Sequence, residues 1–335
     1  MKRIAMICPY FGKFPSNIEL TFKSMEANGF IDWYIFTNIK NIYGDFKNIK
    51  FINMSFEDIK KIIKEKIGTD IKSVYKLCDY KPTYGYIFES YIHEYEYWGF
   101  CDLDVIFGDL SKYLNSKKTE EFSKIYDLGH LSILKNTRET REAFRDFEYM
   151  NKNYVDILNS EYIFVFDETY DKEHKGINGV LEQKGLKIYT NRKEYADLEI
   201  KYNNFYPNYY PKEKHYYFKY QNNKLLLENF DDKNFEREVA YVHLQQKKNL
   251  KIFDNITDDF LITPKGFFNI QTPTKKMFYK INFKTLWYFK FRIKRKINNY
   301  KRNKEIGERW WYQFEIENEY NKFNKYCVIY INVCF

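Results

Sequence analysis

The first 110 residues alternate short apolar runs with stretches of helical periodicity, and this alternation restricts the fold more than any other feature. The strand-like runs are "RIAMICPYF", "IDWYIFTN" and "IKFINMS", and helical spacing is found in "IELTFKSMEANGF" and "FEDIKKIIKEKIG". Ser55 is placed to cap the second helix and Gly68 to end it. Strands that alternate with helices predict an α/β domain on a mostly parallel sheet.

A fourth apolar run delivers acidic residues to its end, in "WGFCDLDVIFGDL" at residues 98–110. Open α/β sheets bind ligands at the carboxyl ends of their strands. Mg²⁺ or Mn²⁺ takes oxygen ligands, commonly one or two carboxylates with substrate phosphates. Asp102 and Asp104 are therefore candidate ligands of a divalent cation, whereas Asp109 is expected to be a turn or cap. The alternative for the pair is a solvated turn.

Composition excludes some classes of protein. The 335 residues are 44% hydrophobic, enough for a sizeable core. Residues 275–304 hold twelve Lys or Arg and no Asp or Glu, so they carry +12 and the rest carries −3 of the net +9. A uniformly basic nucleic-acid binder is thereby disfavoured. Five cysteines without a CxxC pair, a short apolar N-terminal run and no long apolar span predict a cytoplasmic protein.

Several motifs occur in a characteristic order: "ICPYFGKFP", "YIFTN", "YKLCDYKPTYGYIF", "GFCDLDVIFGDL", "FDE" and "YVHLQQKK". This order resembles the metal-dependent GT-A glycosyltransferases of bacterial capsule and lipopolysaccharide assembly. The resemblance covers residues 1–250 and implies a Rossmann-like domain that binds a nucleotide sugar, with a nucleotide-binding half at 1–110 and an acceptor half at 111–250. Residues 251–335 are predicted to be a connector followed by a basic, helical C-terminal region.

The resemblance assigns a metal-binding role to three residues. It implies that Asp104 binds the metal directly and that Asp102 reaches the metal through water or contacts the ribose. His243 would complete the metal shell, and Lys247 or Lys248 would hold the pyrophosphate. Neutral imidazole is a metal ligand, and ammonium groups offset the charge of a departing nucleoside diphosphate. The alternatives are a partly buried strand histidine and a solvated pair of lysines.

The resemblance also places the nucleotide base and the donor sugar. Tyr10 or Phe11 could stack on the base, and Asn38 could hydrogen-bond to its edge. The alternative is a turn with packed aromatic side chains. The loop "KLCDYKP" would contact the nucleotide or the donor sugar through Lys76, Asp79 and Lys81, or it is a surface turn.

An acidic pair, Asp167 and Glu168, follows the run "YIFVF", which is predicted to be a strand. In the resembling enzymes this position holds the carboxylate that orients the acceptor hydroxyl or removes its proton as a general base. His130 is the other polar residue within an apolar run on this side, and a core histidine is the more common situation. The sequence does not decide between inversion and retention at the sugar.

The basic C-terminal region has apolar residues at helical spacing, from Leu286 through Phe289 and Ile293 to Ile297, surrounded by cations. This pattern is typical of a helix that lies on an anionic membrane surface. The alternative is a helix that packs on the domain with a solvated basic face. Membrane contact through residues 275–304 fits the resemblance, because lipid-linked acceptors are presented at the inner face of the membrane.

The sequence thus predicts a glycosyltransferase that uses Mn²⁺ or Mg²⁺ and a UDP-linked sugar, with a cell-surface glycan or lipid-linked acceptor. One rival is a haloacid-dehalogenase-type phosphatase, in which Asp102 of "CDLDV" would be the nucleophile. That motif normally ends the first strand of its fold, whereas here about 100 residues of strands and helices precede it. A second rival is a non-catalytic protein that binds an anionic polymer or membrane through its tail.

Overall fold

The computed structural model describes residues 4–40, 44–149, 151–169, 175–212, 215–247, 250–256, 258–280, 288–290, 292–294, 296–297 and 301. Within these residues the central element is a mixed sheet of seven strands, which confirms the predicted α/β class. Its order is β10 (Ile188–Tyr189), β6 (Lys124–Ile125), β7 (Leu131–Lys135), β4 (Tyr97–Cys101), β1 (Ile4–Pro9), β2 (Ile31–Thr37) and β3 (Ile49–Asn53). Strands β4, β1, β2 and β3 run parallel, and β7 runs antiparallel to β4.

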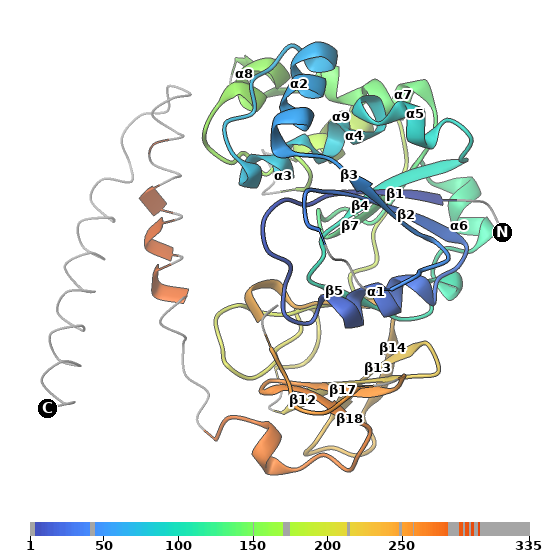
Figure 1. Ribbon diagram of the computed structural model, residues 1–335, viewed down its shortest axis with the longest axis vertical. Helices are drawn as coiled ribbons and strands as arrows, with labels where there is room; N and C mark the ends of the chain where they lie inside the picture. Colours follow the sequence, from blue (N-terminus) through green and yellow to red (C-terminus); the bar gives the residue numbers. More distant parts are fainter. Residues whose placement is uncertain are drawn as a thin grey trace, which may run out of the picture.

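Helices cover one face of this sheet, drawn above it in Figure 1. They are α2 (Phe56–Ile67), α3 (Leu77–Tyr80), α4 (Tyr84–Ile87), α5 (Glu89–Ile92), α7 (Arg138–Glu142), α8 (Tyr154–Asn159) and α9 (Gly176–Gln183). The predicted caps of α2 are confirmed: Ser55 forms a capping box with Asp58, and Gly68 ends the helix at φ 82°. Ile59, Ile63 and Ile67 recur at helical spacing and are buried against the sheet.

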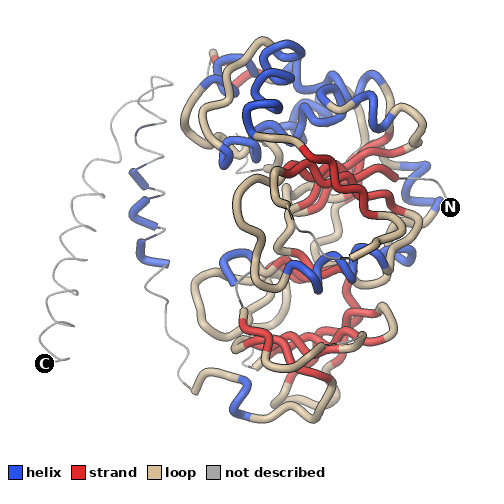
Figure 2. Tube along the Cα trace, in the orientation of Figure 1, coloured by secondary structure: helices blue, strands red, loops and turns tan. Residues whose placement is uncertain are grey.

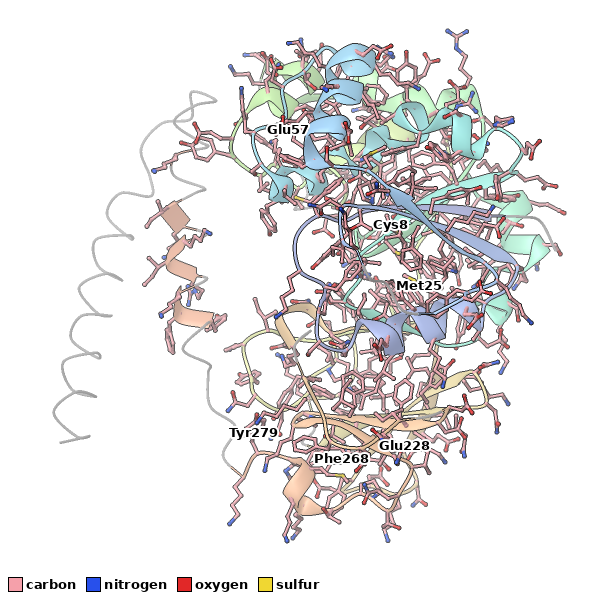
Figure 3. The ribbon with its side chains drawn as sticks, in the orientation of Figure 1. Cys8, Met25, Glu57, Glu228, Phe268 and Tyr279 are labelled. Atoms are coloured by element: carbon pink, nitrogen blue, oxygen red, sulfur yellow. The ribbon has the colours of Figure 1, made fainter. Side chains whose placement is uncertain are left out.

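The other face of the sheet packs on α1 (Ile18–Glu26) and on a small sheet of β11 (Ala196–Asp197), β15 (Tyr241–His243) and β5 (Val105–Phe107). Figure 3 shows Cys8 at the level of the large sheet and Met25 below it, toward α1. Cys8, Met25, Trp33 and Phe107 belong to one buried apolar cluster. The seven-stranded sheet is therefore buried on both faces, which accounts for the continuous apolar sequence of β1.

A further sheet, separate from the two already described, lies at the bottom of the molecule in Figure 2. Among the described residues it has six strands, in the order β14 (Glu236–Val239), β13 (Lys224–Asn229), β12 (Tyr216–Gln221), β17 (Phe260–Thr263), β18 (Gly266–Asn269) and β16 (Lys251–Ile252). Its inner face buries Phe218, Phe260 and Ile262 against Ile106 and Val242 of the small sheet. The remaining described elements are α6 (Ser116–Glu121), the hairpin β8 (Glu148–Tyr149) and β9 (Lys152–Asn153), and six 3-10 turns, Val74–Lys76, Lys81–Thr83, Leu110–Lys112, Ala143–Asp146, Gln245–Lys247 and Lys275–Met277.

Two predictions about local structure are corrected. Residues 251–274 were expected to be a connector, but they supply β16, β17 and β18. The reason is that β17 pairs with β12, β18 pairs with β17, and their apolar side chains share the core of β12. The run "YIFVF" is not a strand. The backbone N–H groups of Phe164 and Phe166 donate to Asp79 at 2.9 and 3.0 Å, and Val165 between them has φ 57°. A β-branched residue at positive φ interrupts an extended chain.

The C-terminal region is described only in part. Residues 288–290, 292–294 and 296–297 are helical, and Phe289 and Ile297 are exposed. Of the other two apolar residues in the predicted helix, Ile293 lies within the described residues and Leu286 lies outside them. Over the described ranges, no helix combines the length and the apolar character that crossing a membrane requires.

A buried ion pair ties the helical layer together. The Lys76 ammonium donates to Asp79 at 2.8 Å and to the carbonyl oxygens of Ile157 and Tyr162, and both charged side chains are 0% exposed. Asp79 in turn accepts the two N–H groups of the segment at 164–166. The pair therefore fixes the position of the chain that leads into Asp167 and Glu168.

We predict that Lys76→Met destabilises the protein by about 3–5 kcal/mol, because it leaves a buried carboxylate without its cation. The free energy of unfolding in urea measures the effect. Lys72→Met, at an exposed position four residues earlier, is the matched control and should stay within about 0.5 kcal/mol of wild type. Equal unfolding midpoints for the two variants would contradict the structural role of Lys76.

Candidate metal and active site

Strand pairing brings the predicted metal ligands together. Asp102 and Asp104 lie between the end of β4 and the start of β5. β15 pairs antiparallel with β5, and His243 is opposite Val105. The backbone N–H of Leu244 also donates to the carbonyl oxygen of Asp104 at 2.8 Å. The histidine therefore reaches the two aspartates across about 140 residues of sequence through a single strand pair.

The three side chains form a compact group. His243 Nε2 lies 3.5 Å from Asp104 Oδ1 and 4.0 Å from Asp102 Oδ2. One possible ligand atom from each residue lies within 4.8 Å of the others. The side chains of His243 and Asp104 are 13% and 14% exposed, whereas that of Asp102 is 36% exposed. The two carboxylates supply oxygen ligands of the kind that Mn²⁺ and Mg²⁺ prefer, and the imidazole adds a nitrogen ligand of the kind that transition metals accept. Asp102 leaves one side open to solvent.

A third aspartate, which the sequence did not single out, holds the opposite nitrogen of the imidazole. Asp197 lies on β11, which pairs parallel with β15 so that Asp197 is opposite His243. Its Oδ1 is 2.8 Å from His243 Nδ1. The sequence signal was weak, since the run "YADL" is short and only two of its residues form a strand.

The surrounding carboxylates stabilise positive charge on this histidine. Burial alone would lower the pKa of His243, but Asp104 and Asp197 together raise that pKa to about 10. Burial would likewise raise the pKa of Asp197, but the hydrogen bond from His243 lowers it well below its ordinary value. The group thus favours a cation, and a divalent metal between Nε2 and the two carboxylates would replace the proton.

A second possible metal group shares His243 and consists of His130, Asp197 and His243. Its geometry fits a metal less well. The 2.8 Å between His243 Nδ1 and Asp197 Oδ1 is a hydrogen-bond distance, and an ion bound to both atoms at about 2.1 Å would normally hold them further apart. The trio of Asp102, Asp104 and His243 is therefore the better candidate.

Lys81 connects the metal group to the acidic pair. Its ammonium is 2.8 Å from Asp102 Oδ1, 3.1 Å from Asp167 Oδ2 and 3.0 Å from the carbonyl oxygen of Gly129. Burial would lower the pKa of Lys81, but Asp102 and then Asp167 raise it well above its ordinary value. Lys81 is therefore a fixed positive charge between the two halves of the site.

Glu168 is the more unusual member of the acidic pair. Burial and then the neighbouring Asp167 raise its pKa to about 7, although the N–H of Gly129 donates to Glu168 Oε2 at 3.1 Å. Gly129 has to be glycine here, because a Cβ would lie 2.0 Å from Asp167 Oδ2. A carboxylate with a pKa near neutrality is suited to accept a proton from a substrate hydroxyl. The strained φ of Val165, just upstream, is typical of functional sites.

These groups line one cavity of about 980 Å³. Its wall includes Asp102, Asp104 and His243, with Lys81 and Glu168. The other lining residues are Cys8, Pro9, Tyr10, Phe11, Pro15, Val74, Tyr75, Leu77, Cys78, Tyr84, Cys101, Leu103, Leu128, His130, Thr169, Arg192, Asp197, Ile200, Tyr209 and Gln245. The volume is of the size that accommodates a substrate larger than a single sugar.

Of the residues predicted to contact the nucleotide or the donor sugar, some line the cavity and others do not. Tyr10 and Phe11 line the cavity, and Tyr10 stacks on Phe14 with ring centroids 5.1 Å apart. Asn38 is exposed and does not line it. Lys76 and Asp79, predicted to contact the nucleotide, are instead buried as the ion pair described above. That burial places them beneath the cavity wall, where they support it.

The two lysines after His243 were predicted to hold the pyrophosphate. Lys247 donates to the carbonyl oxygen of Glu199 at 2.6 Å, and burial lowers its pKa to about 8. It does not line the cavity in this conformation. Lys248 lies outside the described residues.

The sequence did not single out Arg192, which also lines the cavity. Its guanidinium donates to Asp127 at 2.5 Å and to the hydroxyl of Tyr209 at 2.7 Å. His130, weighed as a core residue, is 5% exposed and its Nδ1 lies 3.0 Å from the hydroxyl of Tyr241. Asp109, expected to be a turn or cap, caps the turn at Leu110–Lys112 through the N–H of Ser111.

The chain belongs to the family described as "Family of unknown function (DUF6625)", whose model matches residues 6–271. No curated protein matches the sequence. Among solved structures, the chain is similar to the galactosyltransferase LgtC in complex with donor and acceptor sugar analogs, with 10% identity and a TM-score of 0.33, over 58% of this chain and 75% of that chain. It is also similar to the apo form of the glycosyltransferase GlyE of Streptococcus pneumoniae TIGR4, with 14% identity and a TM-score of 0.31. That similarity covers 60% of this chain and 47% of GlyE. At these identities, residue roles follow only from the geometry of this chain's own site.

We predict that Glu168→Gln stabilises the protein at pH 8 by about 2 kcal/mol. The folded pKa of about 7 exceeds the ordinary value of 4.5, so the folded state binds this proton more tightly than the unfolded state does. Wild-type stability is therefore lost as pH rises from about 4.5 through 7, and glutamine removes that loss. Unfolding in urea at pH 5 and pH 8 measures the difference, which should be smaller at pH 5.

The matched control for this experiment is Glu161→Gln, since Glu161 is exposed. The free energy of unfolding of Glu161→Gln should equal that of wild type at both pH 5 and pH 8. A Glu168→Gln variant whose stability relative to wild type does not change with pH would show that this carboxyl titrates as an ordinary glutamate.

Proposed function

We propose that this protein is a metal-dependent glycosyltransferase with a GT-A-like domain over residues 1–250, extended by the strands at 251–269. It transfers a sugar from a UDP-linked donor to a hydroxyl of a cell-surface glycan or lipid-linked acceptor. The observation that carries the proposal is the convergence of Asp102, Asp104 and His243 at the carboxyl end of β4, on the wall of a cavity of about 980 Å³.

The donor half of the cavity would hold the nucleotide and its diphosphate. Asp102, Asp104 and His243 would hold a divalent cation, which would supply positive charge to the departing nucleoside diphosphate. Tyr10 or Phe11 stacks on the base. Of the other predicted donor contacts, Lys81 lines the cavity and would contact the donor sugar, whereas Asn38 and Lys247 do not line it and are not part of the proposal.

The acceptor half would use the acidic pair. Glu168 faces the cavity and has a pKa near neutrality, so it is the member of the pair that accepts the proton of the acceptor hydroxyl in an inverting reaction. Asp167 is bound to Lys81 at 3.1 Å and holds that lysine in place. In a retaining reaction the same two groups would position the substrates.

We predict that wild-type protein hydrolyses or transfers from at least one nucleotide sugar in the presence of Mn²⁺, and that Asp104→Asn lowers this turnover by about 100-fold or more. The measurement is release of the nucleoside diphosphate from a panel of nucleotide sugars, with and without EDTA. The matched control is Asp109→Asn in the same stretch of sequence, because Asp109 only caps a turn and an asparagine oxygen can still accept from Ser111.

The panel also distinguishes the rival functions. Turnover of p-nitrophenyl phosphate that is lost in Asp102→Asn, with no nucleotide sugar consumed, would establish the phosphatase in place of the transferase. A protein that consumes none of these substrates and binds anionic polymers would support the non-catalytic alternative. Equal turnover in wild type and Asp104→Asn would overturn the metal-dependent mechanism.

We further propose that the basic C-terminal region brings the protein to the cytoplasmic face of an anionic membrane. The described part of this region leaves Phe289 and Ile297 exposed, with Lys290, Arg292 and Lys294 beside them in sequence. Basic residues near an anionic surface each contribute about 1 kcal/mol of attraction. An acceptor carried on a lipid would then be held close to the cavity.

We predict that full-length protein floats with vesicles containing phosphatidylglycerol and not with vesicles of phosphatidylcholine alone. Changing Lys290, Arg292, Lys294 and Lys296 to Gln should reduce flotation with the anionic vesicles. The control changes four lysines of α2 and its surroundings, Lys60, Lys61, Lys64 and Lys72, to Gln and should float as wild type does. Flotation that is equal for all three proteins, or independent of lipid charge, would contradict membrane contact through this region.

A further inference from the structure

The carboxylate of Asp197 is held by hydrogen bonds to three other residues. Its Oδ1 accepts from Gln245 Nε2 at 2.6 Å, in addition to the contact with His243 Nδ1 at 2.8 Å. Its Oδ2 accepts from Asn208 Nδ2 at 2.8 Å, and its backbone oxygen accepts from the N–H of Asn208 at 2.7 Å. With a side chain only 12% exposed and hydrogen bonds to both of its oxygens, this carboxylate is held in its orientation toward the histidine.

The backbone holds Asp197 and His243 in register. The two residues are directly opposite each other in the parallel pair of β11 and β15, and the N–H of Leu198 donates to the carbonyl oxygen of His243 at 3.2 Å. Gln245 adopts φ 52°, an unusual value for a residue with a long side chain, and its amide reaches Asp197. The strained turn therefore brings a second donor onto the carboxylate oxygen that holds the imidazole.

We propose that Asp197 is the positioning residue for His243 as a metal ligand, an inference that rests on the metal site of the proposed function. By accepting the Nδ1 proton, Asp197 fixes the ring with its Nε2 lone pair directed at Asp102 and Asp104. A carboxylate behind a coordinating histidine fixes the tautomer, orients the ring and increases the basicity of the ligand nitrogen. In this role Asp197 acts through the imidazole of His243.

The other neighbours of His243 cannot replace this interaction. The ring of His130 lies with its centroid 4.5 Å from that of His243, a packing contact that leaves rotation of the ring by half a turn possible. On the Nε2 side the partners are the two metal-site carboxylates. Without Asp197, the imidazole could present either nitrogen, and the site would lose part of its preorganisation.

The test is Mn²⁺ affinity, measured on the full-length chain by the loss of the free Mn²⁺ signal in electron paramagnetic resonance. We expect Asp197→Ala to raise the Kd by about 10- to 100-fold. Asp197→Asn keeps an oxygen that can accept the Nδ1 proton and should recover a large part of the affinity. Asp127→Asn is the matched control, since Asp127 is a buried carboxylate that binds Arg192 of the cavity wall and not His243.

A second readout reports on the histidine itself. In the Mg²⁺-bound state, the Nδ1 proton of His243 should give a protected, downfield NMR signal in wild type and Asp197→Asn, and lose it to exchange in Asp197→Ala. Melting in EDTA shows whether each variant is folded. If Asp197→Ala does not fold, the affinity and the Nδ1 signal of Asp197→Asn and Asp197→Ser carry the test, with the serine variant expected to bind more weakly.

The possible outcomes separate this inference from the proposed function. Equal Kd values for wild type and folded Asp197 variants would overturn the positioning role while leaving the metal site intact. Weaker binding in Asp197→Ala, in a protein that consumes no nucleotide sugar, would support the positioning role and overturn the transferase. A wild-type chain that binds no Mn²⁺ would overturn both.

Discussion

The imidazole of His243 is the interaction on which the site depends, because among the described side chains it alone lies against Asp102, Asp104 and Asp197 together. Nε2 faces Asp102 and Asp104, and Nδ1 faces Asp197. These residues come from three separate parts of the chain, and the small sheet of β11, β15 and β5 brings them together. Three acidic groups around a buried position would repel each other, so the site needs a positive charge at its centre. The raised pKa of His243 expresses that requirement.

Around Asp167 and Glu168, the repulsion between carboxylates is offset by the ammonium group of Lys81. Asp167 and Asp102 lie on either side of the Lys81 ammonium, and the backbone of Gly129 lies close enough to contact both Lys81 and Glu168. Burial and then the neighbouring Asp167 raise the pKa of Glu168 to about 7, and among the described residues no lysine or arginine pairs directly with Glu168 to offset that rise. One carboxylate in the cavity is thus able to exchange a proton near pH 7, a property that an acceptor-activating group requires.

Much of the fold was predictable from local pattern, and so was part of the site. The apolar runs of β1 and β4, the caps of α2 and the aspartates after β4 are all encoded within a few neighbouring residues. Asp197 was not predictable, because its role depends on a two-residue strand pairing with a segment 46 positions away. The burial of Lys76 and Asp79 was missed for a related reason: charged residues in a polar-looking loop are expected at the surface, and only their tertiary partners show that they are enclosed.

The same dependence on long-range pairing would connect binding of a metal at this site with folding. Asp102 and Asp104 are close in any conformation of the chain, but His243 joins them only when β15 is paired with β5, and Asp197 joins His243 only when β11 is paired with β15. A cation that needs all of these groups binds the native state in preference to the unfolded chain, and its binding free energy is added to the stability of the small sheet. That sheet packs between the seven-stranded sheet and the six-stranded sheet. A ligand bound at one edge of it is therefore coupled to the contact between the two largest layers of the molecule.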